Sequence, residues 1–152
     1  MPHMVIQVGD KLLSAQARSE NDGHYLAKNY IIPLNLFEFG DFIYYEFVYR
    51  VNLDEFLIYS FVGSKKDDYN RVIKTQDGFI NDLDGGPNIL PKIELDDSTI
   101  IGWIDAQTLK AHVISSAFKN TRPKYPEKKK ELIKLANSLS ETDNPVLVLV
   151  TL

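Results

Sequence analysis

Residues 42–51 read FIYYEFVYRV, the strongest β-strand signal in the chain. A strand periodicity of two makes one face of this segment apolar throughout and leaves a mixed set on the other face. The apolar face carries Ile43, Tyr45, Phe47, Tyr49 and Val51. Asn52–Glu55 then turns the chain into FLIYSFV at 56–62, which is apolar on both faces. Two such runs joined by a short polar segment predict a hairpin within a covered sheet.

Further strand-like runs lie on both sides of this hairpin. Ile31–Phe39 contains Pro33, which cannot donate to a β-ladder, so this run belongs at a sheet edge or begins after the proline. The other runs are residues 4–8, the segment from Leu13 onward, and residues 71–75, 98–106 and 145–152. Ser19–Gly23 reads as a turn. The pattern predicts an all-β, mainly antiparallel protein.

One segment has helical spacing. In residues 125–145 the apolar side chains Leu132, Leu135, Ala136 and Leu139 fall at i, i+3, i+4 and i+7. Pro126 suits a first helical turn, where its missing N–H costs nothing. We therefore expect one C-terminal amphipathic helix, inserted before the last strand.

The bulk composition excludes several classes of protein. The 152 residues suit a single domain, and a net charge of −4 gives the molecule no electrostatic reason to bind nucleic acid. No cysteine is present, which rules out disulfides and thiolate metal sites. No apolar run approaches the ~20 residues that a transmembrane helix requires. Residues 1–4, MPHM, resemble the remainder of a cloning site, and no export signal is visible.

Three segments of the C-terminal half carry a family resemblance. DGFINDLDGGPNILPK (77–92), STIIGWIDAQTLK (98–110) and NTRPKYPEKKKELIKLANSLSETDNPVLVLVTL (120–152) resemble the C-terminal end of TolB-like six-bladed β-propeller proteins of gut bacteria. The ending YPEKKKEL…NPVL is the most specific part. The match covers residues 77–152, about half of the chain, and residues 1–76 fit only as strand-rich sequence.

The resemblance implies propeller-blade-like sheets of four antiparallel strands. It also implies export to the periplasm or cell envelope, as a lipoprotein in full-length form, and brings no catalytic residues or cofactor. A blade takes ~40–45 residues, so the chain holds roughly three blades at most, fewer than a closed ring needs. An incomplete ring leaves a sheet edge or blade face uncovered, and we therefore expect a homo-oligomer.

The loop NDLDGGPNILP, 81–91, has the residue types of a cation site. A helix–loop–helix calcium pattern begun at Asp82 fails, because its sixth position is Pro87 and its twelfth is Ile93. An ordinary turn is the alternative, with polar side chains bonded to their own backbone. We predict that this loop holds no metal and forms a surface contact with a partner, through Asn81, Asp82, Asp84, Gly85, Gly86 and Pro87.

Other catalytic or binding patterns are weak. His24 and His112 are too few and too widely separated for a zinc site, and Ser64 lacks the flanking pattern of a nucleophile elbow. The basic residues of 119–134 fan around a helix and read as a solvated face, with an anionic partner or lipid surface as the weaker alternative. Aromatic residues of 42–50 would form a sugar-binding platform if the mixed face were open, although core packing is the expected use.

These observations favour a non-enzymatic binding or interaction module of the cell envelope. Its partner would be a protein, a small molecule or a glycan. The alternative is a hydrolase-like enzyme with its site at a propeller mouth, where acidic side chains and imidazoles would converge.

Overall fold

The computed structural model describes residues 5–49 and 57–151. The chain divides into two compact units, Met1–Gln76 and Asp77–Leu152. This boundary falls at Asp77, where the propeller-like sequence begins. The single domain expected for residues 1–152 stays a prediction. Helices and strands each account for about a third of the residues.

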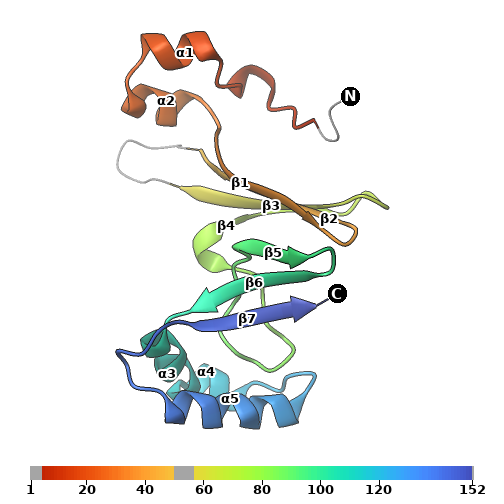
Figure 1. Cartoon of the computed structure of the whole chain (residues 1–152), viewed down its shortest axis with the longest axis vertical. Coiled ribbons are helices and arrows are strands. Elements are labelled where there is room, and N and C mark those ends of the chain that lie inside the picture. Colours follow the sequence, from red (N-terminus) through yellow and green to blue (C-terminus); the bar gives the residue numbers. More distant parts are fainter. Residues whose placement is uncertain (1–4, 50–56, 152) are drawn as a thin grey trace. The chain divides into compact units, whose positions relative to one another are not determined.

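The first unit is built on a four-stranded antiparallel sheet in the order β1-β2-β3-β4 (Figure 1). The strands are β1 (Ile32–Phe39), β2 (Phe42–Val48), β3 (Ile58–Ser64) and β4 (Asn70–Lys74). The predicted strands are confirmed here, and Pro33 lies in an edge strand as expected, just before a register shift. The predicted turn at Asn52–Glu55 and the end of the strand at 50–51 lie outside the described residues.

Two short helices precede this sheet, in a region where the sequence predicted a strand and a turn. They are α1 (Ala15–Glu20) and α2 (Gly23–Asn29), after a 3-10 turn η1 (Gly9–Lys11). The Ser14 hydroxyl accepts a hydrogen bond from the Ala17 N–H, and the Asp22 carboxylate accepts one from the Tyr25 N–H. Ser14, inside the predicted strand, and Asp22, inside the predicted turn, are both helix N-caps, so the strand prediction from Leu13 onward is wrong. Val5–Val8, predicted as a strand, has no regular structure.

Both faces of β2 are covered, and the mixed face is buried more completely than the apolar one. Tyr44, Glu46 and Val48, on the mixed face, are all buried, with Tyr44 fully so. On the apolar face Tyr45 is also buried, whereas Ile43 and Phe47 are only partly buried. Because the mixed face is closed, it offers no open sugar-binding platform.

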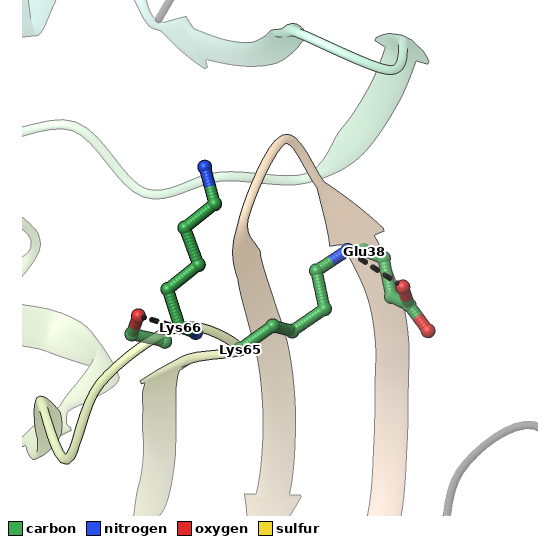
Figure 2. Close-up of polar contacts among 4 residues, drawn as sticks. Glu38, Lys65 and Lys66 are labelled. Atoms are coloured by element: carbon green, nitrogen blue, oxygen red, sulfur yellow. Dashed lines mark hydrogen bonds and ion pairs between the residues drawn. The ribbon is translucent and has the colours of Figure 1, made fainter.

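One end of this sheet is tied together by two lysines of the β3–β4 loop. The Lys65 ammonium lies 2.9 Å from a carboxylate oxygen of Glu38 in β1, and its backbone N–H donates to the Asp41 carbonyl (Figure 2). The Lys66 side chain takes another direction (Figure 2). Its ammonium pairs with the Asp41 carboxylate. Gly40, beside Asp41, has φ 53°, which a two-residue hairpin turn favours.

The second unit has a three-stranded antiparallel sheet in the order β5-β6-β7, with β5 (Ile93–Asp96), β6 (Thr99–Ile104) and β7 (Val146–Thr151). Three helices follow β6, namely α3 (Ala106–Ile114), α4 (Ser116–Asn120) and α5 (Pro126–Ser138). Their core consists of Leu109, Val113, Phe118 and Ala136, and Ile104 and Val146 of the sheet pack against it. This places the helices against one face of the sheet.

The antiparallel sheets and the helix at α5 confirm part of the predicted fold class, but all-β is too narrow a description. The described residues include four further α-helices beside α5, of which α3 and α4 begin after Asp105 and Ser115. The predicted strand 98–106 stops at Ile104 because Asp105 starts a helix. A 3-10 turn, η2 (Thr75–Asp77), follows β4. The propeller-blade arrangement stays a prediction.

Candidate functional site

The predicted contact loop, Asn81–Pro87, is closed by hydrogen bonds among its own residues. One carboxylate oxygen of Asp84 accepts from the Asn81 side-chain amide at 2.7 Å and from the Gly86 N–H at 2.8 Å. The Asn81 amide oxygen in turn accepts from the Leu83 N–H. Gly85 has φ +77°, a conformation that glycine adopts at little cost. These bonds match the predicted turn, in which polar side chains bond to nearby backbone.

The same loop is fastened to the helical layer of its unit. The Gly85 carbonyl lies 2.9 Å from His112 Nε2 on α3, and the Leu83 carbonyl accepts from the Tyr125 N–H. The exposed Asp82 carboxylate pairs with Lys124 at 2.9 Å, and this hydrogen bond raises the pKa of the Lys124 ammonium. The loop is therefore an anchored part of the second unit.

The predicted contact residues differ in what they can offer to a partner. Asp82 is exposed, whereas Gly85 and Gly86 are buried. A Cβ on Gly86 would lie 2.9 Å from an Asp84 carboxylate oxygen and 3.1 Å from a Leu132 methyl carbon. The surface contact at this loop stays a prediction, and any partner would meet Asp82 and Leu83 first.

A different feature, which the sequence did not indicate, lies on the apolar face of the β1–β4 sheet. An apolar hollow of about 410 Å³ is bounded by the sheet on one side and by the irregular segment Val5–Val8 on the other. The sheet contributes Ile43, Tyr45, Phe47, Phe61 and Val72, and Ile31 completes the lining. Segments more than sixty residues apart in sequence thus line one hollow, which is open to solvent at Val5 and Val72. A reading of local periodicity cannot detect it.

The floor of this hollow is aromatic. Tyr45 stacks on Phe47 with ring centroids 5.2 Å apart, and Phe47 stacks on Tyr59 at 5.7 Å. None of the described lining residues is charged, and the polar side chains among them are Gln7 and Tyr45. Burial raises the pKa of the Tyr45 phenol, so its hydroxyl stays a neutral hydrogen-bonding group at physiological pH.

The opposite face of the sheet carries a chain of buried hydroxyl groups. The Tyr44 hydroxyl lies 3.0 Å from Ser60 Oγ, which lies 2.7 Å from Thr75 Oγ1. Burial raises the pKa of Tyr44 to about 12, the Ser60 hydrogen bond lowers it in part, and the negative charge of Glu46 raises it. A phenol held neutral in this way is a structural group and a poor nucleophile near neutral pH.

Two lysines of the second unit are turned inward, and one of them, Lys129, belongs to the basic segment 119–134. Lys129 donates to the carbonyls of Phe118 and Thr121, at 2.6 and 2.7 Å, where α4 ends. Lys110 donates to the carbonyls of Ala136 and Leu139, at 3.3 and 2.8 Å, where α5 ends. Both ammonium groups neutralise the partial negative charge of a helix C-terminus. The basic surface is therefore smaller than the sequence indicates.

No known family model, curated protein or solved structure matches this chain. The propeller resemblance of residues 77–152 accordingly stays a prediction, as does the hydrolase alternative. Among residues 5–49 and 57–151, no cluster of three or more histidine or acidic side chains could hold a metal ion. Within the same residues, no helix is both long enough and apolar enough to span a membrane.

Proposed function

We propose that this protein is a non-enzymatic binding module that holds an uncharged, mainly apolar small molecule in the hollow of its first unit. The observation that carries the proposal is the composition of that hollow, in which a stacked aromatic floor lies opposite the segment Val5–Val8. Ligand sites in proteins are typically apolar spaces of about 300–1,000 Å³ with few polar groups, and this one lies within that range.

The lining also narrows the chemical class of the ligand. A carboxylate or phosphate would lose its hydration with no cation among the described lining residues to replace it. A glycan carries many hydroxyl groups, and the Tyr45 hydroxyl and the Gln7 amide would satisfy few of them. An aromatic ring or a hydrocarbon chain with one polar end fits best. Among a protein, a small molecule and a glycan as partners, we propose the small molecule.

The setting that we propose is the cell envelope, as the resemblance of residues 77–152 implies. Apolar small molecules are sparingly soluble in water, and a protein that shields them in a hydrophobic space has a clear use wherever they must be held or carried. The hollow lies entirely within Met1–Gln76, so ligand binding rests on the first unit alone.

Fluorescence titration with N-phenyl-1-naphthylamine, an uncharged aromatic probe, tests the proposal. The unmodified protein should enhance the probe's emission with a saturable, one-site isotherm. Val72→Glu places a carboxylate at an exposed lining position of β4. It should weaken binding several-fold, because an apolar probe bound beside it would remove part of the hydration of the carboxylate.

Asn70→Glu is the matched control, because it adds the same charge to the same face of β4 outside the lining. This variant should bind the probe as the unmodified protein does. Equal affinities for both variants, or no saturable binding by the unmodified protein, would refute a site in the hollow.

A further inference from the structure

We propose that the open edge of β7 pairs with β7 of a second copy of this chain, antiparallel, to form a continuous six-stranded sheet. Strand β7 is bonded on one side to β6, in register from Thr99↔Thr151 to Ile104↔Val146. On its other side no strand pairs with it within residues 5–49 and 57–151. Its outward N–H and C=O groups are thus available to another strand. This inference is independent of the hollow in the first unit.

The chemistry of β7 differs from that of the other sheet edges. Natural proteins protect edge strands with charged residues, proline, bulges or short length. Strand β1 has Pro33 and a register shift. Strand β4 carries Arg71 and Lys74, and β5 has only four residues, with Glu94 and Asp96 and a register shift. Strand β7 reads VLVLVT and has none of these devices.

The absence of charge is what selects a second copy as the occupant. A two-fold antiparallel pairing brings a strand against itself, so a charged residue meets its own kind at or near the opposite position. In β4 or β5 such a pairing would bring together two or more like charges, which is destabilising. The sequence of β7 brings together only valine, leucine and threonine.

The exposed leucines of β7 favour one register. Leu147 and Leu149 are 62% and 55% exposed, on the face that points away from the helices, because Val146 and Ile104 pack on the helical core. A pairing centred on Val148 sets Leu147 opposite Leu149 of the partner subunit, with both side chains on one face. On that face Trp103 pairs with Leu147, so the apolar row would run across the junction into the partner's sheet.

Sedimentation equilibrium of the full chain over a range of concentrations is the test. The unmodified protein should show a reversible monomer–dimer equilibrium, because a single strand pairing buries less surface than a permanent interface does. Leu147→Lys combined with Leu149→Lys should weaken association at least tenfold, since four ammonium groups would meet at the junction. Both positions are exposed, so the monomer should keep its fold, which circular dichroism checks.

Two further variants serve as controls. One tests the proposed register, and the other tests whether a lysine elsewhere on the same face also weakens association. Leu147→Lys combined with Leu149→Glu places unlike charges opposite each other in the proposed register, so it should associate at least tenfold more tightly than the double lysine variant. Ile93→Lys changes an exposed residue on the same face at the other edge of the sheet, and it should associate as the unmodified protein does.

Three results would overturn the inference. One is an unmodified protein that remains monomeric at all concentrations, which would leave the edge to a strand of another protein. Another is equal weakening by the lysine–lysine and lysine–glutamate variants. The third is an Ile93→Lys variant that associates as weakly as the double lysine variant, because the exposed face of the sheet, and not the β7 edge, would then carry the association.

Discussion

The ammonium group of Lys129 lies 2.6 Å from the Phe118 carbonyl oxygen and 4.5 Å from the centre of the Phe118 ring. A single side chain from the start of α5 thus caps the C-terminus of α4 and lies over the buried Phe118 ring. Lys129→Met keeps the aliphatic stem and removes the charge. We expect it to lower the free energy of unfolding by about 1–3 kcal/mol.

Lys130→Met is the matched control for that variant, because Lys130 is an exposed neighbour on the same helix. Its effect should stay within about 0.5 kcal/mol. Urea unfolding followed by circular dichroism at 222 nm measures both. Equal losses for the two variants would contradict the capping role of Lys129.

The two aspartates of the predicted contact loop should respond differently to alanine. Asp84 accepts two hydrogen bonds that hold the turn, so Asp84→Ala should cost about 1–3 kcal/mol of stability. Asp82 makes an exposed ion pair with Lys124, so Asp82→Ala should cost less than about 1 kcal/mol. Chemical denaturation of both variants measures the two losses in unfolding free energy and shows whether the Asp84 carboxylate stabilises the turn. An Asp84→Ala variant as stable as Asp82→Ala would show that the turn does not depend on this carboxylate.

Tyr44 should make the protein sensitive to alkaline pH. Its pKa is about 12 in the folded state, against an ordinary value of 10.0 for tyrosine, so above pH 10 the unfolded chain loses a proton that the folded chain retains. The stabilisation is fully present below pH 10 and is lost as the pH rises through about 12, at roughly 1.4 kcal/mol per pH unit. Tyr44→Phe should flatten this loss without abolishing it, because burial also raises the pKa of Tyr45.

Unfolding free energies from pH 8 to 11.5 for the unmodified protein and Tyr44→Phe measure this effect. Phenolate absorbance provides a second measurement, in which the difference between the two proteins should titrate near pH 12. A difference that titrates near pH 10 would show that Tyr44 is not shielded from water.

The core of the second unit should depend on α3 far more than on the outer face of α5. Leu109 is fully buried among Val113, Phe118 and Ala136, and Leu109→Ala should cost about 2–5 kcal/mol. Leu135 on α5 is 40% exposed, so Leu135→Ala should cost about 1 kcal/mol or less. Thermal unfolding ranks the two variants. The reverse order would mean that the helical layer packs differently from the structure described above.

Elements whose pattern repeats over enough residues could be predicted from the sequence. Helix α5 has thirteen residues and begins at Pro126. Of its predicted apolar stripe, Leu132 and Ala136 pack in the core, but Leu135 is exposed and Ile133 packs in its place. Strands β1, β2, β3, β6 and β7 show the composition and alternation of sheet residues. The turn at 81–87 could be predicted because asparagine and aspartate side chains hydrogen-bond to nearby backbone and glycine adopts positive φ.

The short helices could not be predicted in the same manner. Helices α1, α2 and α4 have five to seven residues, fewer than two full turns, so no helical periodicity accumulates. Their caps, Ser14, Asp22 and Ser115, are the residue types that also mark turns. Short helices are marginal in isolation, and only packing against the rest of the fold selects the helix over the turn.

The sequence by itself determined the alternation of the strands, the helix α5 and the bonded turn at Asp84, because these depend on residues a few positions apart. Only the tertiary structure decided how completely each face of β2 is buried and that Val5–Val8 lies across the hollow from Val72. It also decided that, among residues 5–49 and 57–151, β7 pairs with β6 alone. These features arise where distant segments meet, and the free energy of that packing is not encoded in any single segment.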